Sequence, residues 1–501
     1  MTLIMIPSIT VVATSLCVFC AFFYIWAKWK LSYWQRRGVP TLPTNIFFGN
    51  FAESIYGRIS AGYLLGKLHN QADPDLKFLG VYIFQKPVFL VRDPTLIRQI
   101  LIKDFSIFSN RYFSVESDND QIGTKNLFSV NNPRWQHMRH KLSPAFSTAK
   151  LKGLFKLMVE SSHSLTNYLE KQFTDPRGIK IIDVEDASTR FITDIIASLA
   201  FGINTNSFEE STQEFYTRSR ELFRTDTLTN ILTFCVFFFP RLANLYPLGI
   251  LGKQEAYIRN IFWASMNARE QAQFHRGDIM DNLLKLKNEK QDSDLKFQGD
   301  VLVAQSVIFF VAGSATSSET MAFTLNELAK RPDIQDRVRQ EIIDILDGDE
   351  LTYEKVQQMK YLHQVINETL RLYPLAPIID RVAEEDYKVP DSNVTIEKGT
   401  PVYVALRGVH MDTKYFSDPE KYDPDRFDEN NKIEPYTYLP FGEGPRICIG
   451  MRIGMMQTAV GLITMLKNYR FSIDPSHENR VHKQAIFIAP ENGVHLRVEK
   501  L

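Results

Sequence analysis

Cysteine is scarce in this chain, with four among 501 residues, which excludes a disulfide scaffold and favours a reducing compartment. Net charge is lacking as well, because 58 lysines and arginines balance 58 aspartates and glutamates. This balance gives no electrostatic basis for binding nucleic acid. The sequence also lacks repeats, low-complexity tracts and a glycine-rich flavin or dinucleotide fingerprint, so any such cofactor must come from another protein. Hydrophobic residues make up 44% and charged residues 23%, as in a folded globular protein.

Charge is missing altogether from the first part of the chain, between Leu3 and Ala27. As a helix this stretch would be roughly 37 Å long, which exceeds the roughly 30 Å hydrocarbon core of a bilayer. Lysines and arginines follow it, which predicts a membrane anchor with the rest of the protein in the cytosol. A cleaved signal peptide is the alternative, but its hydrophobic region would be too long and no basic segment precedes it. Three tryptophans lie at the boundary like an aromatic belt: Trp26, Trp29 and Trp34.

The remainder is predicted to be one large helical body with a minor β portion. We divide the chain into an N-terminal membrane anchor at 1–30, a linker rich in proline and glycine at 31–50, and a folded domain at 51–501. A hairpin is expected from Phe78 to Val91, and further short strands after about residue 385. Cys17 and Cys20 form a C-x-x-C inside the apolar span, without a second ligand pair, and are interpreted as structural.

A second apolar segment covers residues 231–251 and is interrupted by Pro240 and Pro247. It is too broken to span a bilayer. Two interpretations stay open at this point. The segment is either a buried core helix or a lip of the domain that dips into the membrane surface and admits apolar substrates.

The most informative stretch is FGEGPRICIG, from Phe441 to Gly450. Its Cys448 stands just before a helix-like run, whose N-terminal N–H groups and partial positive charge favour a thiolate. Glycines on both sides let the backbone approach the sulfur, and Arg446 offers a fork that suits a carboxylate. Zinc is disfavoured because no further cysteine or histidine ligands cluster nearby. A single thiolate without other protein ligands fits haem iron.

The loop resembles the haem-binding signature of cytochromes P-450, and four other segments match that family in order. Trp135–Arg139 resembles its W-x-x-x-R helix, and Glu368–Arg371 resembles its E-x-x-R pair. Pro419 to Phe427, which includes Arg426, resembles its P-x-R-F region, and Ala312–Ser317 the oxygen-binding groove of its central helix. The resemblance covers essentially the whole chain. From Glu368 onward it is strongest to microsomal insect enzymes that metabolise xenobiotics.

The resemblance implies a mainly α fold of the cytochrome P-450 type, a helical prism with a minor β portion, in which 51–501 is the haem-thiolate catalytic domain. It implies haem b as the cofactor, with Cys448 as the axial iron ligand. Other haem contacts are implied at Trp135, Arg139, Ala312, Gly313, Arg381, Phe441, Arg446 and Gly450. A buried network that supports the cysteine loop is implied for Glu368, Arg371 and Arg426. Residues that fall where the family lines its pocket are Phe108, Phe113, Phe128, Phe309, Phe310, Leu375 and Ile378, although a protein core needs apolar residues equally.

Thr316 is the candidate catalytic residue, on a central helix predicted from Phe297 to Lys330. Its hydroxyl would hold waters that bring protons, and the alternative is a hydrogen bond to the carbonyl oxygen four residues earlier. Gly313 costs about 1 kcal/mol in a helix interior relative to alanine, and room for dioxygen would explain it. The family usually carries Asp or Glu before the threonine, where this chain has Ala315. Glu319, about one turn on, is expected to point away from Thr316, which leaves proton delivery open.

The expected activity is insertion of one oxygen atom of O₂ into small lipophilic substrates such as xenobiotics, plant toxins, insecticides or endogenous lipids. The implied partners are NADPH-cytochrome P-450 reductase, with or without cytochrome b5, and the endoplasmic reticulum membrane. A docking face for the reductase or an ordinary solvated charge run would equally explain four cations, Arg134, Arg139, His140 and Lys141. Two rival functions are a haem-thiolate isomerase or dehydratase that needs no reductase, and a non-catalytic membrane protein that binds haem or a ligand.

Overall fold

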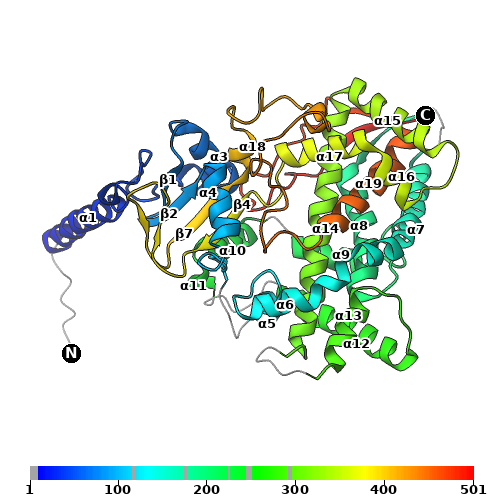
Figure 1. Cartoon of the computed structure of the whole chain (residues 1–501), viewed down its shortest axis with the longest axis horizontal. Helices are drawn as coiled ribbons and strands as arrows, with labels where there is room; N and C mark the ends of the chain where they lie inside the picture. The colour runs from blue at the N-terminus through cyan, green and yellow to red at the C-terminus, as the bar shows by residue number, and fades with distance from the viewer. Residues whose placement is uncertain (1–8, 115–119, 174–177, 224–225, 244–250, 291–295) are drawn as a thin grey trace.

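The structure is a computed structural model that describes residues 9–114, 120–173, 178–223, 226–243, 251–290 and 296–501. The first helices are α1 (Ile9–Leu31), α2 (Ala52–Ile55), α3 (Ala61–Gln71), α4 (Pro94–Arg98), α5 (Gln121–Thr124), α6 (Arg134–Leu142), α7 (Thr148–Gln172), α8 (Val184–Phe201), α9 (Glu214–Arg220), α10 (Thr227–Phe238) and α11 (Pro240–Ala243). They are followed by α12 (Glu255–Ala272), α13 (Ile279–Asn288), α14 (Asp300–Ala329), α15 (Pro332–Leu346), α16 (Tyr353–Gln358), α17 (Lys360–Leu372), α18 (Leu406–His410) and α19 (Met451–Asn468). Helices make up most of the molecule, as predicted (Figure 1).

The minor β portion consists of short strands in small sheets. The strands are β1 (Phe78–Ile83), β2 (Lys86–Val91), β3 (Ile179–Asp183), β4 (Ile378–Val382), β5 (Tyr387–Lys388), β6 (Thr395–Ile396), β7 (Pro401–Ala405), β8 (Tyr469–Ile473) and β9 (His495–Lys500). One sheet has the order β1-β2-β7-β4, and the predicted hairpin is its antiparallel β1–β2 pair. Strand β7 pairs parallel with β2 and antiparallel with β4, which joins the late strands to the early hairpin.

Buried apolar side chains form one large cluster among the helices and smaller clusters on both faces of the sheet β1-β2-β7-β4. Strands β1, β2, β7 and β4 lie at the end of the molecule next to α1, and α14 runs through the middle of the helical part (Figure 1). Helix α4 shows how local sequence starts such elements, because Asp93 accepts a hydrogen bond from the N–H of Leu96 and Pro94 occupies the first turn. Proline tolerates this position since its missing N–H would have no helical partner there.

Helix α14 is the central helix, and its bounds Asp300–Ala329 agree with the prediction within a few residues. Within the described part of the chain it is the helix that is long and apolar enough to cross a membrane, but most of its apolar stretch is buried inside the protein. It is therefore a core helix. Helix α8 lies along it, and α19 crosses it just after the cysteine loop (Figure 1).

Helix α1 projects from the body beside the sheet (Figure 1), and its apolar side chains are exposed, Phe22 at 70% and Ile25 at 68% among them. The C-terminal end of α1 is fixed to the rest of the protein. Trp34, which was expected in an aromatic belt, is fully buried against β1, where its ring fills the space that a Cβ on Gly80 would need. The exposed apolar part of α1 therefore ends before Leu31, which is itself buried.

The second apolar segment combines features of both interpretations. Phe238 at the end of α10 is buried against Phe51 of the sheet core, with ring centroids 5.5 Å apart. Leu228 and Ile231 on the same helix are exposed. Residues 244–250 of this segment lie outside the described residues.

Candidate cofactor site around Cys448

The loop before α19 is closed on itself by its backbone. The N–H of Cys448 donates to the carbonyl oxygen of Phe441 at 2.9 Å. Gly444 has φ +75°, and a Cβ there would lie 2.2 Å from the carbonyl oxygen of Leu101. Only glycine fits this close approach without displacement of the backbone. Gly450 follows Cys448 as the N-cap of α19.

Cys448 lies deep in the protein yet is accessible. Burial raises the pKa of its thiol, and hydrogen bonds from the backbone N–H groups of Gly450 and Met451 lower it, as does the nearby Arg139. Its side chain is nevertheless exposed. A deeply placed but accessible thiol faces an internal space, and the N–H groups of a helix start are aimed at its sulfur.

The central helix also presents accessible side chains in its otherwise buried middle. Ala312 and Thr316 are exposed, whereas Ser314 and Ser317 are buried. The hydroxyl of Thr316 donates to the carbonyl oxygen of Ala312 at 2.6 Å, which is the alternative that the sequence left open. Its oxygen keeps free lone pairs that can accept a hydrogen bond.

Gly313 lies where α14 approaches α8. A Cβ on Gly313 would lie 3.0 Å from Cδ1 of Ile196 on α8, so an alanine there would require the Ile196 side chain to shift slightly. The carbonyl oxygen of Gly313 accepts a hydrogen bond from Nε2 of Gln457 on α19 at 3.0 Å, and the same nitrogen donates to Ser317. Gln457 thus ties the helix that follows Cys448 to the central helix.

A cluster of buried arginines lies beside the loop. Trp135 of α6 lies under the guanidinium of Arg446, 4.3 Å from ring centroid to Cζ. Arg446 donates from Nε to the carbonyl oxygen of Ser109 at 2.6 Å. Its pKa is lowered to about 8 by burial and by Arg111 and Arg381, with Arg139 adding to the effect. Asp380 is the carboxylate that raises it.

The arginine cluster carries more positive charge than the described residues neutralise. Burial and the neighbouring Arg111 lower the pKa of Arg381 to about 9, and its Nε has no hydrogen-bond partner among the described residues. Arg111 is paired with Asp380 at 2.9 Å, but its own Nε is likewise unpartnered. Buried charges are stable when they are paired. This arrangement therefore fits a ligand with carboxylate groups.

Glu368, Arg371 and Arg426 are brought together behind the loop. Arg371 holds Glu368 through two hydrogen bonds of 2.7 and 2.8 Å, and both side chains are fully buried. Nε of Arg426 lies 3.5 Å from the same carboxylate. Arg371 also donates to the carbonyl oxygen of His410 at 2.9 Å. The paired charges thus satisfy backbone groups from a distant part of the chain.

His410 connects this network to the cysteine loop. Its Nδ1 lies 3.1 Å from the carbonyl oxygen of Arg371, and its Nε2 accepts from the N–H of Leu439 at 3.0 Å. The carbonyl oxygen of Leu439 in turn accepts from the N–H of Gly442. Burial lowers the pKa of His410 to about 3, so the ring is neutral and its tautomer is set by these two bonds.

The residues expected to line a pocket fall into separate groups. Phe113 and Phe128 lie together, 5.1 Å between centroids, and Phe237 of α10 joins them at 4.7 Å from Phe113. Phe108 packs against Tyr387 in the sheet core. The others lie elsewhere: Phe309 against Phe146, Phe310 among Phe201, Phe215 and Phe223, Leu375 with Phe323, and Ile378 at the edge of the core under β7.

The cations of α6 that were considered as a docking face for the reductase lie in different environments. Arg139 faces inward, because burial lowers its pKa and Cys448 raises it. Lys141 is paired with Glu289 at 2.8 Å, and His140 is exposed. Four functional candidates carry no sequence signal that we recognised: Arg111, Asp380, His410 and Gln457. They stand far apart along the chain without motif spacing, and only the fold brings them to the site.

Comparison with known proteins agrees along nearly the whole chain. The family model described as Cytochrome P450 matches residues 42–497. Cytochrome P450 6k1 of Blattella germanica is 38% identical over 469 residues, which cover 89% of this chain and 88% of that protein. Probable cytochrome P450 6g2 of Drosophila melanogaster is 36% identical over 488 residues, 93% and 94% of the two chains. Cytochrome P450 6j1 of Blattella germanica is 34% identical over 489 residues, 95% of each.

Proposed function

This chain belongs to the cytochrome P450 family of haem monooxygenases, and from that premise we propose that Cys448 binds the iron of haem b and that the chain oxidises small lipophilic substrates. The single observation that supports the ligand best is the accessible Cys448 thiol, deep in the protein and hydrogen-bonded by the start of α19. The family uses haem b with a cysteine thiolate ligand, which supplies activation of O₂ when bound.

The residues present fit that cofactor. Burial lowers the pKa values of Arg446, Arg381 and Arg139, and neighbouring arginines lower those of Arg446 and Arg381 further. Two propionate groups would pair with these guanidinium groups. Trp135 holds the guanidinium of Arg446 in place by a cation–π contact. Ala312 of α14 adds a small exposed side chain.

The chain's own contribution to the chemistry is the environment of the sulfur. The N–H groups of Gly450 and Met451 donate to it and stabilise negative charge. Hydrogen bonds of this kind tune a metal–thiolate bond. The buried pair of Glu368 and Arg371, acting through His410 and the backbone of Leu439, fixes the loop that carries the sulfur.

The test of the ligand is the spectrum of the reduced protein with carbon monoxide. A thiolate ligand gives a strongly red-shifted band, which Cys448→Ala abolishes. Cys235→Ala is the matched control, because Cys235 is half-buried on α10 and leaves the band intact. Retention of the band in Cys448→Ala would show that another group binds the iron.

We further propose that electrons reach the site from NADPH through NADPH-cytochrome P-450 reductase, with or without cytochrome b5. The sequence lacks a flavin or dinucleotide motif that could take that part. With reductase added, NADPH consumption should accompany an oxygenated product. Product from an organic hydroperoxide alone, with none from NADPH, would instead favour an isomerase or dehydratase, and haem without any turnover a binding protein.

The proposed substrates are small and lipophilic, in the class of xenobiotics, plant toxins, insecticides or endogenous lipids. The contact of Phe113, Phe128 and Phe237 supports an aromatic wall near the arginine cluster, because Arg111 lies 4.3 Å from the centroid of Phe128. Ligand-induced changes in the haem spectrum, screened over apolar aromatic and aliphatic compounds, identify the substrate. Preference for strongly polar compounds would contradict this proposal.

The proposed location is the endoplasmic reticulum membrane, with residues 1–30 as the anchor and 51–501 in the cytosol. The exposed apolar face of α1 supports it, since an exposed apolar helix is costly in water. Removal of residues 1–27 should weaken membrane binding and leave haem incorporation intact, because the buried Leu31 and Trp34 are retained. Loss of haem incorporation in that truncated protein would show that the anchor is part of the fold.

A further inference from the structure

Lys86 is the first residue of β2, and its half-buried side chain reaches the end of α10. Its Nζ donates to the carbonyl oxygen of Phe238, the last residue of α10, at 3.0 Å. The same nitrogen lies 3.8 Å from the ring centroid of Tyr112 and 5.3 Å from that of Phe239. The last carbonyl groups of a helix have no helical partner and carry partial negative charge. The ammonium therefore caps α10 and contacts two aromatic faces at once.

The charge of Lys86 is held without a carboxylate. Burial, with a further contribution from Arg241 of α11, lowers the pKa of Lys86 to about 8. Among the described residues no carboxylate forms an ion pair with its Nζ. A partly buried charge without a counter-ion is costly. The carbonyl oxygen and the two rings are therefore the groups that stabilise this ammonium, and they are the groups that lose a partner when it is removed.

Tyr112 belongs to a short segment, residues 111–113, that is also fixed from the other direction. The N–H of Tyr112 donates to one carboxylate oxygen of Asp380 on β4 at 2.8 Å. The guanidinium of Arg111 donates to the other oxygen of the same carboxylate at 2.9 Å. The segment 111–113 is thus attached to β4 through its backbone and to the β1–β2 hairpin through the ring of Tyr112 and the ammonium of Lys86.

The aromatic wall combines this segment with α10. Phe113 comes from the segment and Phe237 from α10, and their ring centroids are 4.7 Å apart. Each is adjacent along the chain to a group that Lys86 contacts, because Phe113 follows Tyr112 and Phe237 precedes Phe238. One cation therefore holds both halves of the wall against the same hairpin.

We propose that Lys86 is a positioning residue that sets the spacing of the two segments of the aromatic wall, and with it the shape of the lipophilic ligands that the site accepts. The inference rests on the proposed function, in which Phe113, Phe128 and Phe237 face the substrate. With Lys86 in place, residues 111–113 and the end of α10 are held together, which favours a flat aromatic ligand. Without Lys86 the two segments can separate, so that wider ligands gain relative to flat ones.

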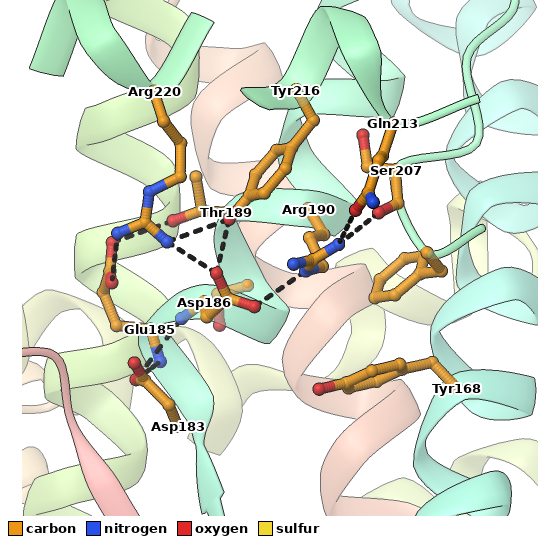
Figure 2. Close-up of polar contacts among 12 residues, drawn as sticks. Tyr168, Asp183, Glu185, Asp186, Thr189, Arg190, Ser207, Gln213, Tyr216 and Arg220 are labelled. Atoms are coloured by element: carbon orange, nitrogen blue, oxygen red, sulfur yellow. Dashed lines mark hydrogen bonds and ion pairs between the residues drawn. The ribbon is translucent and has the colours of Figure 1, made fainter. Parts of the chain in front are cut away.

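Helix α9, which precedes α10 along the chain, has a polar attachment of its own. Arg220 of α9 donates to Asp186 of α8 at 2.5 Å, and the hydroxyl of Tyr216 donates to the same carboxylate (Figure 2). Arg190 holds Asp186 from within α8 at 2.7 Å (Figure 2). These contacts involve no residue of the aromatic wall. Arg220→Gln therefore loosens α9 from α8 and leaves the contacts of Lys86 in place, which makes it the control for general loosening of this part of the chain.

The first test is ligand binding to the ferric haem protein, which is measured from the haem spectrum without turnover. The probes are two neutral compounds, naphthalene, which is flat, and di-tert-butylnaphthalene, which is wide. Lys86→Met should raise the dissociation constant of naphthalene relative to that of the wide probe by about 3–10-fold, as expected for the loss of a cation–π contact and a hydrogen bond. Lys86→Arg keeps the charge and should keep the ratio close to that of the wild type.

Two controls accompany this measurement. Lys152 is an exposed lysine that lies 5.1 Å from the ring centroid of Tyr353 and pairs with Glu354. Lys152→Met makes the same chemical change as Lys86→Met and should leave the ratio unchanged. Arg220→Gln should also leave the ratio unchanged, because the wall segments keep their attachment to the hairpin.

The second test is the pH dependence of the same ratio. Lys86 loses its proton near pH 8, so raising the pH from about 7 to about 9 should move the wild type toward Lys86→Met. The other charged or titratable groups on the surrounding elements are Arg241, which stays charged, the phenol of Tyr112, Asp380 behind it, and the thiol of Cys235 on α10, whose pKa is raised by burial. All of them remain in Lys86→Arg, which should show no such shift. If Lys86→Met does not bind haem, this comparison of the wild type with Lys86→Arg decides.

The possible failures are distinguishable. With the carbon monoxide band intact, an unchanged ratio in Lys86→Met, or an equal shift in Arg220→Gln, overturns the role of Lys86 and leaves the monooxygenase standing. If neither probe changes the haem spectrum of the wild type, the aromatic wall is not a binding surface and the inference fails with it. Absence of the carbon monoxide band in the wild type overturns the proposed iron ligand instead.

Discussion

The segment behind the Cys448 loop and the middle of α14 both belong to the proposed site but satisfy their polar groups differently. Behind the loop, Glu368 and Arg371 are fully buried and bonded to each other and to backbone carbonyls. On α14, the hydroxyls of Ser306 and Ser314 are buried without partners among the described residues. Paired buried groups hold one geometry, whereas unpaired buried polar groups mark places where a water can bind. The pair of Glu368 and Arg371 is thus held rigidly behind the loop, whereas the middle of α14 keeps hydroxyl groups that can bind water.

The largest expected effect comes from breaking the buried pair. Arg371→Ala leaves the carboxylate of Glu368 without its main partner, which should cost about 3–5 kcal/mol of unfolding free energy. Chemical denaturation of the haem-bound protein measures it. Arg337→Ala is the control, because Arg337 pairs with Asp425 at the surface, 2.9 Å apart, and such pairs contribute about 0–1 kcal/mol. Equal effects of the two substitutions would contradict the rigid network.

The next effect concerns the close approach of the loop to the chain before it. Gly442→Ala places a side chain at φ +74° with nothing within 4 Å, and should cost about 1–2 kcal/mol. Gly444→Ala has a similar φ but also meets the carbonyl oxygen of Leu101, which should add about 1–3 kcal/mol. Thermal unfolding of the two variants separates conformational strain from the clash. Equal stability would mean that the backbone yields at Leu101.

His410, which connects the buried pair of Glu368 and Arg371 to the cysteine loop, predicts that the stability of the protein depends on pH. Its pKa is lowered to about 3 in the folded protein, and an unfolded histidine titrates near ~6.5. Between these values the unfolded chain binds a proton that the folded one does not, so His410 lowers stability as pH falls from about 6.5 toward 3. At pH 5 the loss is about 2 kcal/mol. His410→Gln should flatten this slope, while the exposed His163→Gln should keep it. An unchanged slope in His410→Gln would place the acid sensitivity elsewhere.

The comparison also separates what the sequence predicts from what only the fold reveals. The residues around the proposed iron ligand belong to short motifs with fixed spacing along the sequence. Cys448, Trp135 and the pair of Glu368 and Arg371 could therefore be selected from the sequence. Arg111 and Asp380 could not, because their meeting depends on pairing between segments about 270 residues apart. On α14 the close approach of Gly313 to Ile196 of α8 could not be predicted either, because it depends on how the two helices pack.

The smallest expected effect sharpens the contrast on the helix side. Ala315 stands where the family usually carries an acid, so Ala315→Glu should raise the product formed per NADPH a few-fold, because the new carboxyl group adds a proton donor beside Thr316. This gain requires that the carboxyl group finds water and is not simply buried. Thr316→Ala should lower the coupling of NADPH consumption to product, since the oxygen of Thr316 can accept a hydrogen bond from a water and position it. Product and peroxide per NADPH with one substrate are measured for the wild type and the two variants. A tightly coupled wild type that Thr316→Ala leaves unchanged would mean that protons reach the site by another route and that Thr316 has no part in it.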